Sequence, residues 1–162
     1  MSFQPPNPAP RTQISASATS PAGPDTNPPH TILLIDDDDK MPLLLLRALK
    51  RLKPTPLLQY AANAFEAQAY LLARDQFADR AQYPFPDLVL LDLKMPLIDG
   101  LQFLEWARAL PEFKRLPILV LTSSENPNHF KSARERGATS CLNKPTQMQQ
   151  LLPHLKLLLG MA

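Results

Sequence analysis

Short apolar runs alternate with longer helical stretches along most of this chain, and this alternation narrows the folds that the chain can adopt. From Thr31 onward, runs with strand-like composition are separated by stretches whose apolar residues recur at helical spacing. The strand-like runs are TILLI, TPLLQYA, DLVLLD, LPILVLT and TSCL, and the helical stretches are MPLLLLRALKRL, NAFEAQAYLLAR, LQFLEWARAL, NPNHFKSARERG and TQMQQLLPHLKLLL. Five strands alternating with five helices are typical of an α/β protein with a parallel sheet covered on both faces.

Boundary residues support these elements. Asn63 with Glu66 three positions later resembles a capping pair, and Asn126 stands before a proline that suits the first position of a helix. Gly137 follows a helical stretch where a left-handed stop is expected. Pro153 lies inside the last helical stretch, so that helix should either kink there or begin late.

The first thirty residues have a different composition. Eight of the nineteen prolines fall in residues 1–30, where Arg11 and Asp25 are the only Lys, Arg, Asp or Glu and few apolar groups are available for burial. Such a segment cannot offset the entropy of folding. We therefore expect a disordered Pro-rich tail over residues 1–30 and a single folded domain over residues 31–160.

Composition excludes several classes of protein. A net charge of +2 and a pI near 8.8, without a basic stripe, do not indicate nucleic-acid binding. One cysteine rules out an internal disulfide framework and a cysteine-based zinc site. The N-terminus has no apolar signal core, and the leucine run at 43–46 is too short to span a bilayer. These features lead us to expect a soluble cytoplasmic protein that makes no contact with nucleic acid or membrane.

The sequence ILLIDDDDK at residues 32–40 places four carboxylates directly after an apolar run. Two charges held about 4 Å apart repel by about 4 kcal/mol at an effective dielectric constant near 20. The aspartates must therefore either spread into water or surround a cation.

Other polar residues follow the remaining strands. Asp36 and Asp37 follow the first strand, Asp92 ends the third, Thr122 ends the fourth, and Lys144 follows the fifth. Each alone is an ordinary cap or surface residue, but the carboxyl ends of parallel strands meet at one edge, where ligands bind in open α/β sheets. Pro145 suggests a constrained bond after Lys144, a candidate for the cis form, that aims the lysine inward.

This set of side chains suits phosphoryl chemistry. Mg²⁺ prefers oxygen ligands and needs only one or two carboxylates in addition to waters and a phosphoryl oxygen. A carboxylate can attack phosphorus and form an aspartyl phosphate. A metal on one side and a lysine with a hydroxyl on the other would neutralise the charge of the transferring group. We therefore predict that two of the four aspartates hold Mg²⁺.

The motifs IDD at 35–37, LLDLKMPLIDG at 90–100, LTSSE at 121–125 and NKP at 143–145 together resemble the receiver domain of bacterial two-component response regulators. The resemblance covers about residues 31–159. The stretch FADRAQYPFPDLVLLDLKMP is similar to single-domain regulators that pair with phytochrome-type and related histidine kinases. The family implies a flavodoxin-like, doubly wound, five-stranded parallel sheet of strand order 2-1-3-4-5 with five helices.

The resemblance also implies roles for individual residues. Asp92 would be the phosphoacceptor, with Thr122 and Lys144 contacting the phosphoryl oxygens. Mg²⁺ would be bound by Asp36, Asp37, Asp92 and the backbone carbonyl of Lys94. The chain would then be a signalling phosphoprotein that assists its own phosphorylation and slow dephosphorylation, rather than an enzyme.

Three features depart from the family pattern. Receivers usually carry an aromatic residue three positions before the lysine, where this chain has Cys141. Lys94 places a cation where many receivers have a neutral residue, and Ser123 replaces a common alanine. Asp38 and Asp39 match no ligand position, so we expect them to form the solvated start of the first helix, where the helix dipole favours negative charge.

Two kinds of enzyme and an adaptor are the alternatives to this function. Asp36 and Asp38 have the two-residue spacing of haloacid-dehalogenase-type phosphatases, but Lys40 stands where that family requires Thr or Val. A nucleotide-hydrolysing enzyme is disfavoured because there are only four glycines and no phosphate-binding loop motif. The serious alternative is an adaptor that keeps the receiver shape and binds a partner without phosphorylation.

The expected partners follow from the resemblance. The phosphoryl donor would be a sensor histidine kinase or a phosphotransfer protein. Only one helix remains after Lys144, so we expect no DNA-binding output domain. The output would be a contact with a downstream protein or a homodimer, whose affinity depends on phosphorylation.

Overall fold

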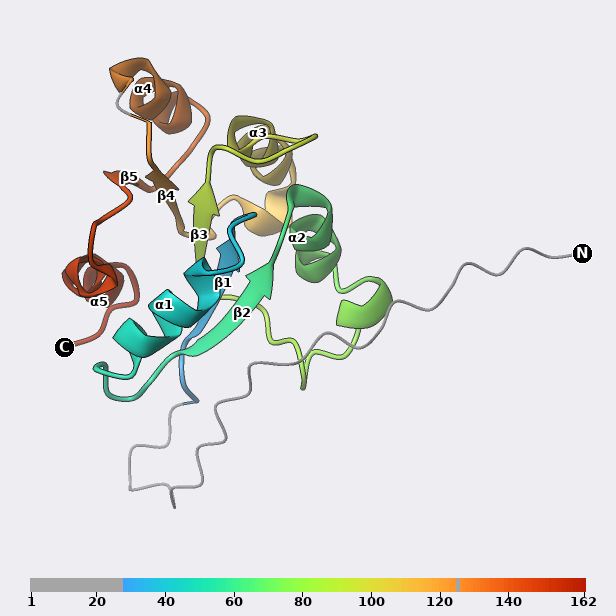
Figure 1. Ribbon diagram of the computed structural model, residues 1–162. Coiled ribbons are helices and arrows are strands. Elements are labelled where there is room, and N and C mark those ends of the chain that lie inside the picture. Colours follow the sequence, from blue (N-terminus) through green and yellow to red (C-terminus); the bar gives the residue numbers. More distant parts are fainter. Residues whose placement is uncertain (1–27, 125) are drawn as a thin grey trace, which may run out of the picture.

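A computed structural model describes residues 28–124 and 126–162 of the chain. Most of the tail expected over residues 1–30 therefore lies outside the described residues. Five parallel strands form one sheet in the order β2-β1-β3-β4-β5, and helices cover both faces (Figure 1). The α/β class and the strand order predicted from the sequence and the family resemblance are confirmed.

The elements follow the predicted runs, and most of them are shorter than the run that predicted them. The strands are β1 (Thr31–Ile35), β2 (Leu57–Ala61), β3 (Leu88–Asp92), β4 (Ile118–Thr122) and β5 (Ser140–Asn143), and the α-helices are α1 (Met41–Leu49), α2 (Ala64–Leu71), α3 (Gly100–Ala109), α4 (Pro127–Glu135) and α5 (Leu152–Leu158). Short 3₁₀ helices span Asp75–Phe77, Pro111–Phe113 and Met148–Leu151.

The two faces of the sheet carry separate cores, because successive side chains of a strand point to opposite sides. On one side, Leu33, Val89 and Val120 pack with α2, α3 and α4. On the other side, Ile32, Leu90 and Leu119 pack with α1 and α5. The central strands β1, β3 and β4 are buried along their whole length, which explains why they are continuous apolar runs rather than alternating ones.

The predicted boundary residues behave largely as expected. The Asn63 side chain accepts a hydrogen bond from Glu66 N, and the Asn126 side chain accepts one from Asn128 N. Gly137 has a φ of 98°, the left-handed conformation expected after α4. Of the two outcomes considered for Pro153, the late start is correct, since it lies in the first turn of α5.

The start of the first helix differs from the prediction. Asp38 and Asp39 are exposed, as expected, but they precede the helix, which begins at Met41. Asp38 Oδ1 accepts a hydrogen bond from Lys40 N, and its carbonyl accepts one from Met41 N. The two aspartates therefore lie in the turn before the helix, where the Asp38 side chain bonds the backbone N–H of Lys40.

The bond between Lys144 and Pro145, the candidate for the cis form, is trans. The cis bond in the described part of the chain is Lys53–Pro54.

Among the described residues, no helix has both the length and the apolar character needed to cross a membrane.

Candidate functional site

The candidate site lies at the carboxyl edge of the sheet, between the two central strands. β1 and β3 pair in register with Ile35 opposite Leu91, so the next residues, Asp36 and Asp92, lie opposite each other. β1 is also the strand at which the order reverses, since the chain goes from β1 outward to β2 and then back to β3. Open α/β sheets bind their ligands at such a point.

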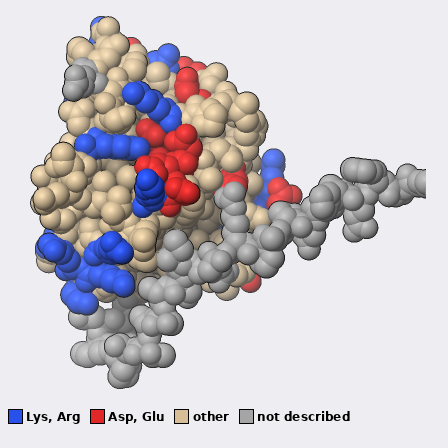
Figure 2. Space-filling view, in the orientation of Figure 1, with Lys and Arg blue, Asp and Glu red and all other residues tan. Residues whose placement is uncertain are grey.

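Three carboxylates meet at this edge. One oxygen from each of Asp36, Asp37 and Asp92 lies within 4.8 Å of the others. Asp36 and Asp92 are almost completely buried, with 1% and 4% of their surface exposed, and Asp37 is exposed. The red patch at the centre of Figure 2 shows acidic side chains gathered on the surface, with lysine or arginine side chains around it.

Lys144 supplies the balancing charge. Its Nζ lies 2.8 Å from Asp36 Oδ2 and 3.4 Å from Asp92 Oδ2, so it bridges two of the three carboxylates. Its backbone N–H donates to the Thr122 carbonyl at 2.9 Å, which fixes the end of β5 beside β4. Burial alone would lower the pKa of Lys144, but the hydrogen bond to Asp36 and the charges of both carboxylates outweigh burial and raise the pKa.

The environment of Asp92 disfavours its charged form. Burial raises the pKa of Asp92 most, and the negative charge of Asp36 raises it further. Lys144 and the backbone N–H of Lys94 act in the opposite direction without cancelling the shift. A second cation at this site would therefore favour the ionised carboxylate that a nucleophile requires.

The loop after β1 is held in place by local hydrogen bonds. Asp36 Oδ1 accepts from Asp38 N at 2.9 Å, and the Asp36 carbonyl accepts from the Tyr60 hydroxyl at 2.8 Å. Sequence reasoning missed Tyr60, because a tyrosine in a strand-like run has no feature that distinguishes it from a core residue. Its hydroxyl ties β2 to the residue that begins the acidic cluster.

The loop after β3 depends on a close backbone approach. A Cβ atom on Gly100 would lie 2.6 Å from the Asp92 carbonyl oxygen and 2.7 Å from Leu93 Cα. The Gly100 N–H donates to the Leu93 carbonyl at 3.0 Å. Only glycine fits this approach, which turns the chain from Asp92 into α3.

Thr122 occupies the predicted position but faces its own loop. It is fully buried at the end of β4, and its hydroxyl oxygen accepts a hydrogen bond from Ser124 N at 3.1 Å. The Ser124 hydroxyl in turn accepts from Asn126 N at 3.2 Å. Ser124, which sequence reasoning did not single out, is therefore part of the loop that holds Thr122.

Lys94 and Cys141 stand at the positions where the sequence departs from the family pattern. The Lys94 side chain is exposed beside Asp92. Cys141 is buried on β5, and its Sγ lies 4.0 Å from the Phe130 carbonyl of α4. Burial raises the pKa of the Cys141 thiol, which keeps it neutral in this packing.

The donor set fits a hard divalent cation. All three acidic residues offer carboxylate oxygens, and the exposed side of the cluster leaves room for water ligands. The sheet is doubly wound in this strand order, the acidic cluster lies at the switch point, and a lysine directly follows the last strand. Together these features define a receiver domain.

The chain belongs to the response regulator receiver domain family, whose model matches residues 32–156. Response regulator Rcp1 of Synechocystis sp. is 30% identical over 127 residues, an alignment that covers 78% of this chain and 84% of Rcp1.

Two solved structures show the same fold. The phosphorylated cyanobacterial phytochrome response regulator RcpA superposes with a TM-score of 0.69 at 26% identity, covering 82% of this chain and 91% of RcpA. The Mn²⁺-bound form of response regulator Rcp1 superposes with a TM-score of 0.66 at 29% identity, with the same coverage. The predicted resemblance to receivers, and to phytochrome-type regulators among them, is confirmed.

Proposed function

We propose that this protein is a single-domain response regulator that accepts a phosphoryl group on Asp92 in an Mg²⁺-dependent reaction. The observation that carries the proposal is the meeting of Asp36, Asp37 and Asp92 at one edge, bridged by Lys144. The phosphorylated state of RcpA and the Mn²⁺-bound state of Rcp1 support the same chemistry in similar proteins.

The reaction is an in-line transfer. An oxygen of Asp92 attacks phosphorus and forms the O–P bond, while the P–N bond to the donor's histidine breaks and the imidazole keeps the electron pair and takes up a proton. Lys144, now bonded to both carboxylates, offers its ammonium group to the phosphoryl oxygens. The Thr122 hydroxyl oxygen accepts from Ser124 N, which leaves its own proton available for donation to a phosphoryl oxygen.

Asp36, Asp37, Asp92 and the Lys94 carbonyl would hold Mg²⁺. The ion would neutralise charge on the phosphoryl oxygens, which is the contribution that phosphoryl transfer needs most. This chain's own residues orient the acceptor: Lys94 N–H bonds Asp92 Oδ1, and Gly100 lets the backbone of α3 approach Asp92 closely.

The partners are proposed from the family. The donor is a sensor histidine kinase or a phosphotransfer protein, and the output is a phosphorylation-dependent contact with a downstream protein or a second copy of the chain, in the cytoplasm. Residues 31–160 would carry this function. An adaptor that does not need phosphorylation is the second candidate, and the intact acidic cluster disfavours it.

The test is phosphorylation by a small acyl phosphate or amidophosphate donor. The wild type should be labelled only when Mg²⁺ is present, Asp92→Asn should not be labelled, and Lys144→Ala should be labelled about tenfold or more slowly, because it loses the cation beside the acceptor. Asp75→Asn serves as the control, because it makes the same change at an exposed aspartate outside the cluster. Equal labelling of wild type and Asp92→Asn would support the adaptor instead.

A further inference from the structure

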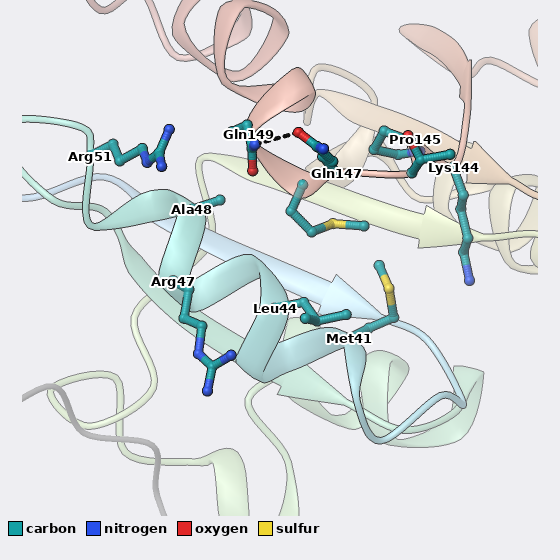
Figure 3. Close-up of a pocket in the computed structure, with 11 residues that line it drawn as sticks. Met41, Leu44, Arg47, Ala48, Arg51, Lys144, Pro145, Gln147 and Gln149 are labelled. Atoms are coloured by element: carbon teal, nitrogen blue, oxygen red, sulfur yellow. Dashed lines mark hydrogen bonds between the residues drawn. The ribbon is translucent and has the colours of Figure 1, made fainter.

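Asp36 is held through all four of its polar groups. Its backbone N–H donates to the Ala61 carbonyl at 3.2 Å, and its own carbonyl accepts from the Tyr60 hydroxyl at 2.8 Å. Its Oδ1 accepts from Asp38 N at 2.9 Å, and its Oδ2 pairs with Lys144 Nζ at 2.8 Å. Figure 3 shows the Lys144 side chain reaching from the segment after β5 toward the loop between β1 and α1. Of these four contacts, the one from Tyr60 can be removed without removing a charge or a backbone group.

The sheet places the Tyr60 side chain for this contact. Tyr60 pairs with Leu34 in the parallel register of β1 and β2, so Asp36 lies two positions beyond its partner. The ring is partly buried against the core on the α1 and α5 side, and its hydroxyl reaches past the end of β1. Because a ring packed in this way has few alternative positions, the direction of its hydroxyl is set before any ligand binds.

The peptide unit that follows Asp36 leads directly into Asp37. Because a peptide unit is planar, a hydrogen bond that fixes the Asp36 carbonyl also fixes the direction in which the chain enters Asp37. The next peptide unit is fixed as well, because Asp38 N donates back to Asp36 Oδ1. Asp37 therefore lies between two anchored peptide units.

The Asp37 carboxylate depends on this backbone for its place. Asp37 is exposed, and no described residue forms a hydrogen bond or an ion pair with its side chain. One of its oxygens nevertheless lies within 4.8 Å of oxygens of Asp36 and Asp92, although repulsion would drive an exposed carboxylate toward water. The restraint that the described residues provide on this third carboxylate is the position of its backbone.

We infer that Tyr60 is a positioning residue of the metal site. Its hydroxyl holds the peptide unit between Asp36 and Asp37, and so keeps the Asp37 carboxylate within reach of a divalent cation. The Asp36 carbonyl is not among the predicted ligands, so the hydrogen bond and the ion do not compete for it. The inference rests on the proposed function, because it requires the acidic cluster to bind Mg²⁺.

A purely structural role would explain the same hydrogen bond, because the hydroxyl of a buried tyrosine usually finds a partner. Tyr70 is such a case. Its hydroxyl donates to the Pro84 carbonyl at 2.7 Å, in the core on the α2 and α3 side and at the end of the sheet where β3 begins. Tyr60 and Tyr70 thus make the same kind of bond, but only Tyr60 makes it to a residue of the acidic cluster. If both roles were structural, removing either hydroxyl would leave the affinity for Mg²⁺ unchanged.

The experiment titrates the full-length, unphosphorylated protein with Mg²⁺ alone. Chemical shifts of the backbone amides follow the titration and give the dissociation constant even when binding is weak. Tyr60→Phe should raise the Mg²⁺ dissociation constant about three- to tenfold relative to the wild type. Tyr70→Phe is the matched control and should leave the dissociation constant nearly unchanged, although it also loses a tyrosine hydrogen bond. Urea unfolding of both variants checks that they fold.

A double-mutant cycle determines whether the hydroxyl acts through Asp37. In an Asp37→Asn background, Tyr60→Phe should change the Mg²⁺ dissociation constant by less than about twofold, because the carboxylate that Tyr60 positions is gone. In the Tyr60→Phe single variant, the Mg²⁺ concentration that gives half-maximal labelling of Asp92 should rise by the same factor as the dissociation constant.

Three results would overturn the inference and leave the proposed function in place. They are an unchanged dissociation constant in Tyr60→Phe, an equal increase in Tyr70→Phe, and an effect of Tyr60→Phe that persists in full in the Asp37→Asn background. A wild type that binds no Mg²⁺ and is not labelled on Asp92 would instead contradict the proposed function, and the inference with it.

Discussion

At the scale of single residues, Lys144 holds the site together. It bridges Asp36 and Asp92, two carboxylates that would otherwise repel each other in a buried place. Its own pKa is raised, so the stability from this bridge is present below the ordinary lysine pKa and is lost as the pH rises through the raised value. The bridge is therefore intact at neutral pH.

At Lys144 the charges of the carboxylates outweigh the effect of burial on the pKa, whereas at Asp92 burial outweighs the charge of Lys144. This difference leads to a pH-dependent prediction. Because its folded-state pKa is raised, ionisation of Asp92 costs stability, and this cost appears as the pH rises through the folded-state pKa. Without added metal, Asp92→Asn should therefore have a higher urea midpoint than the wild type at neutral pH, and the gap should narrow as the pH falls toward the ordinary aspartate pKa.

The control for this measurement is Asp75→Asn, which removes an exposed carboxylate outside the site. Its midpoint should follow the wild type at every pH. A loss of stability in Asp92→Asn at neutral pH, or a gap that does not change with pH, would contradict the burial argument.

At the scale of elements, α3 is tied to its neighbours at both ends, and its N-terminal end lies against the backbone of Asp92 and Leu93. At the C-terminal end, the Arg108 guanidinium donates to the carbonyls of Gly137, Phe113 and Leu116. Arg136 and Glu105 add an ion pair at 2.6 Å between the end of α4 and α3. At the N-terminal end, Asp99 and Gln102 form a capping box, and Gly100 packs against the backbone of β3.

Gly100→Ala should be destabilising although alanine is the better helix former. The added Cβ meets backbone atoms of Asp92 and Leu93 that cannot move without shifting β3. We expect a loss of about 1 to 3 kcal/mol in the free energy of unfolding, with slower phosphorylation of Asp92. Urea unfolding and labelling by a small donor measure the two effects.

Gly160→Ala separates crowding from backbone strain. Gly160 has a φ of 65°, and a Cβ added there would have no neighbouring atom within 4 Å, so alanine meets only the left-handed backbone penalty of about 1 to 2 kcal/mol. It should leave phosphorylation unchanged. If Gly100→Ala were as stable and as active as the wild type, the close approach would have no role in placing Asp92.

At the scale of the whole molecule, charge is distributed unevenly. The carboxyl edge of the sheet carries the acidic cluster, and residues 40–62, which include α1, contain five basic residues and no aspartate or glutamate. The two buried cores stabilise the fold. Repulsion among the three carboxylates of the acidic cluster lowers the stability of the fold unless a cation neutralises their charge.

Magnesium should therefore stabilise the fold as a whole. An ion that binds only the native state adds about 2.7 kcal/mol at a hundredfold excess over its dissociation constant. Asp37→Asn should reduce this gain, because Asp37 belongs to the cluster and is exposed enough to be changed without disturbing the core. Thermal unfolding with and without Mg²⁺ measures the gain.

Asp39→Asn is the matched control. Asp39 is an exposed aspartate two residues away in the same acidic run, and it is outside the cluster. It should keep the full gain from Mg²⁺. Equal gains in the wild type and Asp37→Asn would mean that the ion binds elsewhere.

The amino-acid sequence by itself determined the element types, the class of fold and the residues at the strand ends. These follow from local causes: the apolar periods, the Asn63 and Asn126 caps, and the rule that parallel strands end at one edge. The strand order came from the family motifs, and so did the individual roles of Asp92, Thr122 and Lys144.

Only the tertiary structure decided how these residues are held. The Lys144 bridge, the Tyr60 hydrogen bond and the Gly100 approach join residues that are up to 108 positions apart, as Lys144 is from Asp36. Each is a close approach of 2.6 to 2.8 Å. The core on one face of the sheet likewise requires α1 and the segment after β5 to pack together. Local sequence patterns contain no such distances, because packing between distant segments sets them.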